Sequence, residues 1–176
     1  MYHHVPLGEK APDMFNAIIE ISKGSQNKYE YDEKLDLIKL DRVLYSPFFY
    51  PLDYGFIPET RSADGDHLDV MVIGSMPLVT GTLVECRPIG LLKMIDDGDE
   101  DFKVIAVQAK NPRMDWLTDL PHLETGYGHM LKEIKHFFEH MKDLQGKKVE
   151  VQGYENSENA KKAILEAHET FKREQQ

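Results

Sequence analysis

The chain has 176 residues, 41% of them hydrophobic and 30% charged, which is typical of a single globular domain spanning residues 1–176. Its formal net charge of −10 excludes a nucleic-acid or membrane binder that works through a basic face. One cysteine, Cys86, excludes an internal disulfide framework, and no apolar run is long enough to cross a bilayer, so the expected location is cytoplasmic.

Short apolar segments separated by Pro, Gly, Asp and Asn predict strands along most of the chain. The predicted strands are residues 15–21, 28–32, 35–42, 68–73, 83–94, 102–107 and 148–155. Cys86 falls within one of them, where we expect a packed small hydrophobic side chain rather than a reactive thiol. Many short strands at this spacing are typical of a small barrel or sandwich.

The hydrophobic period changes in the C-terminal third of the chain. Apolar residues recur at i+3 and i+4 from 127 to 144 and predict an amphipathic helix, which Gly146 would end. A second helix is predicted to begin near Ser157 as its N-cap. Its apolar face consists of Ala160, Ile164, Ala167 and Phe171. The expected fold is α+β and mainly β, a β-barrel with two helices from the C-terminal region packed against it.

Three carboxylates stand close together in the segment Asp64-Gly65-Asp66-His67-Leu68-Asp69. Gly65 allows a tight turn, and a buried strand then follows. Asp64, Asp66 and Asp69 could all face one Mg²⁺ ion, which prefers oxygen ligands. A solvated polar turn explains the same residues equally well, whereas Leu68 stands where an EF-hand has an acidic ligand.

A second acidic cluster surrounds Gly98 and consists of Asp96, Asp97, Asp99, Glu100 and Asp101. An exposed hairpin turn accounts for it, but a shared cation would relieve the repulsion between so many like charges. Basic residues lie beside or between the acids, namely Lys28, Arg42, Lys103 and Lys142, and Glu20 and Glu30 flank the first of them. Each alone is a surface charge, but together they could bind phosphoryl oxygens once cations offset the acids.

In chain order, these motifs resemble those of the soluble family I inorganic pyrophosphatases of the prokaryotic type, over essentially the whole chain. The matching segments are Ile19-Glu20-Ile21, Lys28-Tyr29-Glu30, Leu40-Asp41-Arg42, Tyr50-Pro51, Asp53-Tyr54-Gly55, Asp64-Gly65-Asp66, Cys86-Arg87-Pro88-Ile89-Gly90, Glu100-Asp101-Phe102-Lys103, His136-Phe137-Phe138-Glu139-His140 and Lys142-Asp143-Leu144. A single Asp-rich loop would be weak support, but this collinear set is specific.

The resemblance implies a five-stranded OB-like barrel and an enzyme that hydrolyses inorganic pyrophosphate to two phosphates. It implies up to four Mg²⁺ ions per subunit, with Mn²⁺ as an alternative and Ca²⁺ as an inhibitor. By motif position, the tightest ion is bound by Asp64, Asp69 and Asp101, and the ions that arrive with substrate by Glu20, Glu30, Asp96 and Asp101. Asp69 would also reach a second ion, and water bridging these two ions would be the nucleophile. Two bridged metals lower the pKa of that water toward about 7. Asp66 would be the general base, and the phosphates would be held by Lys28, Arg42, Tyr54, Lys103 and Lys142.

Two positions depart from the family pattern. His67 replaces the usual Pro or Glu, and we expect it to point outward, with tuning of the base as the alternative. Met141 replaces a Tyr that precedes Lys142, so one hydrogen bond to phosphate would be missing.

His136 and His140 invite interpretation as metal ligands, but they lie beside the apolar stripe of helix 127–144 rather than facing the acids. The resemblance instead implies a homo-oligomer, with a hexamer favoured and this helix at a subunit interface that could be sensitive to pH.

Two other classes of function compete with a pyrophosphatase. An OB-like module binding nucleic acid is opposed by the acidic charge, and one binding only calcium leaves the basic set unexplained. An enzyme acting on nucleotides is opposed by the lack of a Walker loop.

Overall fold

The structure is a computed structural model that describes residues 2–175. Within that range the strands are β1 (Phe15–Ile21), β2 (Asn27–Asp32), β3 (Leu37–Val43), β4 (Asp53–Ile57), β5 (Leu68–Ile73), β6 (Leu83–Asp96), β7 (Asp99–Gln108) and β8 (Val149–Asn156). The helices are α1 (Leu120–His140) and α2 (Ser157–Glu174), and short 3₁₀ helices cover Tyr2–His4, Pro112–Met114 and Asp143–Gln145. No helix between residues 2 and 175 is both long and apolar enough to cross a membrane.

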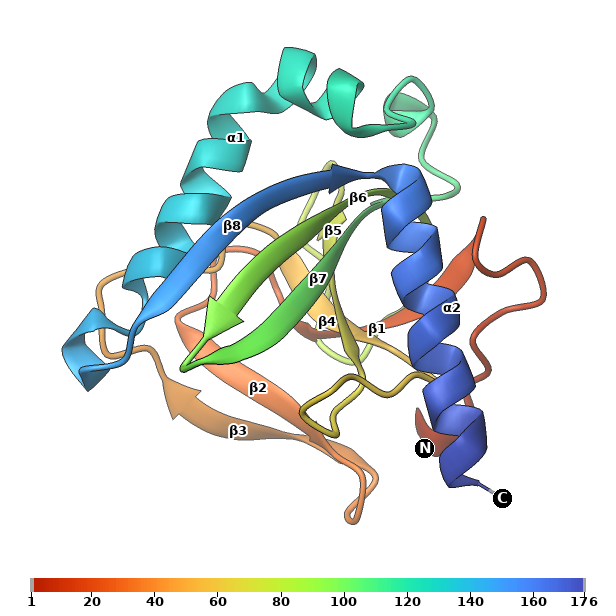
Figure 1. Cartoon of the computed structure of the whole chain (residues 1–176), viewed down its shortest axis with the longest axis horizontal. Coiled ribbons are helices and arrows are strands. Elements are labelled where there is room, and N and C mark those ends of the chain that lie inside the picture. The colour runs from red at the N-terminus through yellow and green to blue at the C-terminus, as the bar shows by residue number, and fades with distance from the viewer. Residues whose placement is uncertain (1, 176) are drawn as a thin grey trace.

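Five strands close into a ring in the order β1-β4-β5-β7-β6, because β1 pairs with β6 as well as with β4 (Figure 1). β5 pairs with β7 in parallel, and the neighbouring pairs of the ring are antiparallel. β8 extends the sheet from β6, while β2 and β3 form a separate hairpin. The ring and the two helices confirm the predicted five-stranded barrel with helices packed against it.

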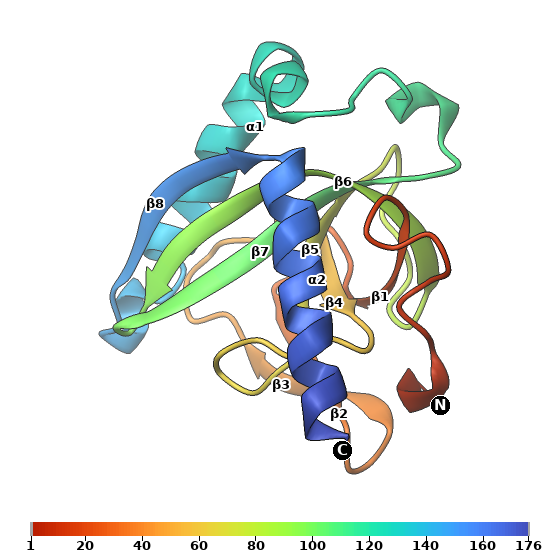
Figure 2. The ribbon, with the colours of Figure 1, turned by 45° about the vertical axis from the view of Figure 1, so that its right-hand side comes forward.

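Side chains of the ring strands alternate between two hydrophobic cores. On β7, Ile105 and Val107 belong to a core that includes residues of α1, whereas Val104 and Ala106 belong to one that includes residues of α2. Figures 1 and 2 show the two helices against different parts of the barrel. Burial on both faces explains why β5 is apolar except for Asp69, and the sequence pattern predicts this strand with its observed bounds.

β4 was not predicted from the sequence, although all of its residues are buried. It contains Gly55, and glycine lowers the strand propensity of a short segment. The structure requires glycine here because a Cβ at this position would lie 1.9 Å from the carbonyl oxygen of Ile18 on β1. Gly55 therefore allows the close approach of β4 to β1, and the same residue weakens the sequence pattern that would predict a strand here.

The start and end of α1 differ from the prediction. It begins at Leu120, whose backbone N–H donates to the capping Asp119 side chain at 2.8 Å. The non-helical backbone of Tyr127 (φ −135°, ψ 29°) interrupts the pattern there, so only the later part was recognised. The helix ends at His140, and Leu144, which the prediction placed on it, is 68% exposed.

The prediction for α2 is wrong only at its cap. Asn156, not Ser157, is the N-cap, and its side chain accepts a hydrogen bond from the backbone of Asn159. The predicted apolar face is present, with Ala160, Ile164 and Ala167 buried and Phe171 half-buried. Cys86 on β6 is fully buried, as expected of a packing residue.

Candidate active site

One cavity of about 230 Å³ lies among the β2–β3 hairpin, the loop before β5, the β6–β7 hairpin and the end of α1. The structure brings all twelve predicted site residues to it: Glu20, Lys28, Glu30, Arg42, Tyr54, Asp64, Asp66, Asp69, Asp96, Asp101, Lys103 and Lys142. With Glu33, eight carboxylates and four Lys or Arg side chains of the described chain line the cavity. Residues from distant parts of the sequence thus form one highly charged cavity.

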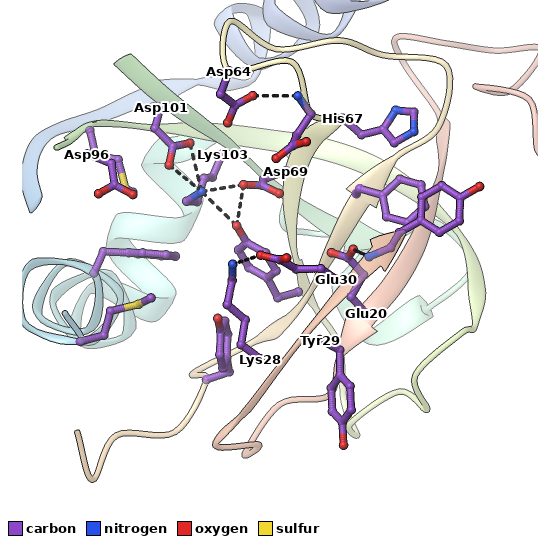
Figure 3. Close-up of a pocket in the computed structure, with 18 of the residues that line it drawn as sticks. Glu20, Lys28, Tyr29, Glu30, Asp64, His67, Asp69, Asp96, Asp101 and Lys103 are labelled. Atoms are coloured by element: carbon purple, nitrogen blue, oxygen red, sulfur yellow. Dashed lines mark hydrogen bonds and ion pairs between the residues drawn. The ribbon is translucent and has the colours of Figure 1, made fainter. Parts of the chain in front are cut away.

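Lys103 occupies the centre of the carboxylate cluster (Figure 3). Its Nζ donates to Asp69 Oδ2 at 2.7 Å, to both oxygens of Asp101 at 3.0 Å, and to the Tyr54 hydroxyl at 2.9 Å. Tyr54 in turn donates to Asp69 at 2.6 Å. The parallel register of β5 and β7, which places Asp69 opposite Lys103, fixes this arrangement. Burial alone would lower the pKa of Lys103, but the two carboxylates outweigh it and raise the pKa.

Burial and repulsion from neighbouring carboxylates raise the pKa of several carboxyl groups in the cavity. Burial, followed by repulsion from Asp69, raises the pKa of Glu20 to about 8, although Tyr31 N–H donates to this carboxylate at 2.7 Å. Burial and the neighbouring Asp64 and Asp69 raise the pKa of Asp66. Burial also raises the pKa of Asp101 against the opposing effect of Lys103. The cavity therefore holds more negative charge than its own cations neutralise.

Two of the basic side chains form a cross-strand pair of like charge on the β2–β3 hairpin. Lys28 on β2 lies directly opposite Arg42 on β3, a like-charge pair that is unfavourable unless an anion lies nearby. Asp41 partly fulfils that role, since it forms an ion pair with Arg42 and lies 3.6 Å from Lys28. Arg42 Nε is nevertheless buried without a hydrogen-bond partner within the described chain. An unpaired donor at this position suits an anionic ligand.

The opposite wall has an unpaired acceptor. Lys142 forms an ion pair with Asp96 through Oδ2, but Asp96 Oδ1 is buried and has no hydrogen-bond partner among residues 2–175. An orphan carboxylate oxygen is the kind of donor that Mg²⁺ accepts. Across residues 2–175, however, no three His, Cys, Asp or Glu side chains lie close enough to hold one metal ion. Asp69 and Asp101 are paired with Lys103 instead. The cavity therefore offers the oxygen ligands that a cation prefers, but the carboxylates are not already arranged as a metal site.

The β6–β7 turn divides the second acidic cluster. Asp97 (φ 57°) and Gly98 (φ 104°) form its two-residue loop between the paired Asp96 and Asp99. Asp96 and Asp101 line the cavity, whereas the carboxylates between them are exposed. The structure therefore supports a ligand-facing role for these two residues and a solvated turn for the rest.

His67 does not point outward, and that expectation is wrong. Its ring stacks on Phe56 with centroids 4.9 Å apart, and its side chain is 13% exposed. Nδ1 donates to the Thr60 carbonyl at 2.8 Å, because a carbonyl oxygen can only accept, and Nε2 lies 3.0 Å from Glu33. Figure 3 shows the ring turned away from Asp64 and Asp69. Burial lowers the pKa of His67, which acts as a buried anchor of the loop.

Part of the cavity wall is apolar. Met141 is buried and lines the cavity beside Phe138, as expected of a residue on the apolar stripe. His136 and His140 do not line it, in agreement with the interpretation that they face away from the acids. Glu33 is a lining carboxylate that the sequence did not predict, because it stands in a charged turn without a motif.

Comparison with known proteins points to one family. A family model described as "Inorganic pyrophosphatase" matches residues 17–172. An inorganic pyrophosphatase of Halalkalibacterium halodurans is 49% identical over 92% of this chain and 97% of its own, and one of Geobacillus stearothermophilus is 49% identical over 85% and 89%. The crystal structure of inorganic pyrophosphatase from Thermus thermophilus aligns with a TM-score of 0.91 and 43% identity, over 97% of this chain and 98% of that chain.

We predict that Glu20→Gln makes stability in the presence of a chelator less dependent on pH. The pKa of Glu20 is about 8 in the folded chain, against about 4.5 for an ordinary glutamate, so folding favours the protonated carboxyl. That stabilisation is complete below about pH 4.5 and is lost as the pH rises through about 8. Urea unfolding from pH 5 to 9 should show the wild type losing on the order of 4 kcal/mol relative to Glu20→Gln.

Glu100→Gln, which changes an exposed carboxylate, is the control for that experiment. It should follow the wild type across the same pH range. Parallel curves for the wild type and Glu20→Gln would contradict the prediction.

Proposed function

Because this chain belongs to the inorganic pyrophosphatase family, we propose that it hydrolyses inorganic pyrophosphate to two phosphates with the help of Mg²⁺. One observation carries the proposal: eight carboxylates and four basic side chains of the described residues line a single cavity. The carboxylates suit hard cations and the basic side chains suit phosphoryl oxygens. A binding module for calcium alone would have no use for the second set.

We propose that Asp64, Asp69 and Asp101 hold the tightest Mg²⁺ ion and that Glu20, Glu30 and Asp96 serve ions that accompany the substrate. The unpaired Oδ1 of Asp96 supports a cation ligand on that wall, and the raised pKa of the buried Glu20 indicates that a cation beside it would be stabilising. Bound Mg²⁺ would supply a water of lowered pKa and neutralise charge on the phosphates. Mn²⁺ would substitute for it, and Ca²⁺ would inhibit.

Asp66 is the proposed general base. Its carboxylate is on the exposed side of the loop before β5, and its raised pKa makes it a better proton acceptor than an ordinary aspartate. It hydrogen-bonds through its backbone N–H to Asp64 at 3.0 Å, which leaves the side-chain oxygens for a water molecule. This residue would take the proton of the attacking water.

The basic residues would bind and orient the phosphates. Arg42 has an unpaired Nε, and Lys28 lies opposite it, so these two offer a ready site for phosphoryl oxygens. Lys142 approaches from the end of α1. Tyr54 and Lys103 are proposed phosphate ligands as well, although in the structure their protons are directed at Asp69 and Asp101. Positive groups placed here would stabilise the leaving phosphate.

Phosphate release from pyrophosphate, ATP and a phosphomonoester tests the function. With Mg²⁺ we expect release from pyrophosphate far above that from the other two substrates, and little with Ca²⁺ or chelator.

Asp66→Asn should lower turnover about 10²–10⁴-fold while Mg²⁺ binding is largely kept, because only proton transfer is lost. Asp99→Asn, which removes an exposed carboxylate outside the cavity, is the matched control. Hydrolysis without Mg²⁺, or full activity of Asp66→Asn, would refute the mechanism.

A second prediction concerns Met141, which lines the cavity beside Lys142. A tyrosine there would place a hydroxyl near the phosphates, and a hydrogen bond to a charged group contributes about 1.5–3 kcal/mol. We expect Met141→Tyr to lower KM about tenfold or more. Met141→Phe adds the ring without the hydroxyl and should not lower KM. A KM of Met141→Tyr that is unchanged or raised would show the prediction to be wrong.

We also propose that the enzyme is a cytoplasmic homohexamer with α1 at a subunit interface. His136 is exposed, its ring centroid lies 4.5 Å from that of His140, and His140 Nδ1 lies 2.9 Å from Asp143 Oδ2. Native mass spectrometry should give six subunits near pH 7 and smaller species near pH 5.5. The same mass at both pH values would count against a pH-sensitive interface.

A further inference from the structure

The loop between β4 and β5, residues 58–67, carries Asp64 and Asp66 in its middle, while Thr60 and His67 on either side of them are packed against the barrel. Residues 63–66 are exposed, and Gly65 has a left-handed backbone (φ 89°). A second cavity of about 160 Å³ lies behind the loop, lined by residues of α2 such as Ala163 and Ala167. Hydrogen bonds within the exposed segment, such as Ser62 N–H to the Asp66 carbonyl at 2.8 Å and Asp66 N–H to Asp64 Oδ1 at 3.0 Å, join this segment only to itself. A contact with other elements is needed to hold the segment in place against the rest of the fold.

Arg61 supplies that contact. Its Nη1 donates to the Gly65 carbonyl at 2.7 Å and to Glu33 at 2.9 Å, and its Nε donates to Glu174 at 2.9 Å. Its backbone N–H donates to the Ala167 carbonyl at 2.9 Å. One side chain thus joins the acidic loop to the β2–β3 turn and to the last turn of α2, which lie near the loop in Figures 1 and 2.

We propose that Arg61 is a positioning residue that holds the acidic loop so that Asp64 and Asp66 face the cavity. The Gly65 carbonyl shares one peptide plane with the Asp66 N–H, which donates to Asp64 Oδ1 at 3.0 Å, so fixing this plane constrains both aspartates. The side chain of Arg61 is only 12% exposed, although its two carboxylate partners are 48% exposed. A planar guanidinium can serve these three acceptors at once, which the ammonium of lysine cannot do with the same geometry.

Charge and geometry predict opposite effects of replacing Arg61. If only its positive charge mattered, removing it would leave Glu33 and Glu174 unopposed and strengthen the binding of a cation. If it positions the loop, its removal weakens cation binding although the local charge becomes more negative. The sign of the change in Mg²⁺ affinity therefore separates the two roles. Where it concerns Mg²⁺, the proposal rests on the proposed function.

The test compares Arg61→Gln, Arg61→Lys and Arg87→Gln with the wild type. Arg87 is the matched control, because it also donates to backbone carbonyls, those of Leu117 and Met114, but lies outside the cavity. Mg²⁺ binding is measured by calorimetry without substrate, and unfolding in urea with chelator. We expect about tenfold weaker Mg²⁺ binding in both Arg61 variants and unchanged binding in Arg87→Gln. Equal or tighter binding in Arg61→Gln would overturn the proposal.

Hydrogen exchange of the amides of residues 62–66, in chelator, provides a readout that needs neither metal nor turnover. These amides should exchange several-fold faster in Arg61→Gln, with the barrel strands unchanged, and equal rates in the loop would also overturn the proposal. A wild type that failed to hydrolyse pyrophosphate or to bind Mg²⁺ would refute the proposed function, whereas the exchange rates would still decide the role of Arg61.

Discussion

The rest of the site depends on the burial of Lys103 among Asp69, Asp101 and Tyr54. A side chain that is 3% exposed cannot keep its charge without partners, and breaking such a buried pair typically costs about 3–5 kcal/mol. The parallel pairing of β5 and β7 places Asp69 opposite Lys103, Asp101 lies two residues earlier on β7, and Tyr54 comes from β4. A charged group is thus the structural centre of a cavity whose ligands would also be charged.

The charges that line the cavity destabilise the folded chain when no ligand is bound. Burial, with repulsion between carboxylates added to it, raises the pKa of Glu20, Asp66 and Asp101, while Lys28 faces Arg42 across a hairpin. A protein selected only for stability would disperse these charges. Opposite charges concentrated around one cavity are instead suited to binding cations and an anion together. The burial that raises these pKa values also strengthens electrostatic attraction to a ligand.

The sequence pattern was sufficient wherever local chemistry decides structure. β1 and β5 are predicted with their observed bounds, because mainly apolar runs between turn residues have few other interpretations. Motifs indicate all twelve candidate site residues, and the structure places them around one cavity. Failures came where tertiary contacts decide. β4 contains a glycine that only its neighbour explains, and the kink at Tyr127 divides α1. His67 is buried because Phe56 and α2 cover it. Arg61 belongs to no sequence motif that would predict its hydrogen-bond partners.

Closure of the ring between β1 and β6 determines when a site can exist at all. Glu20 lies on β1 and Lys142 follows α1, so the cavity walls come from segments that are far apart along the chain. Contacts over such separations form late in folding, because the entropy of loop closure is lost before they contribute. Before these segments meet, the same acids and amines share no cavity. The cavity is therefore a property of the completed barrel, because its charged side chains come from β1, the β2–β3 hairpin, the loop before β5, the β6–β7 hairpin and the end of α1.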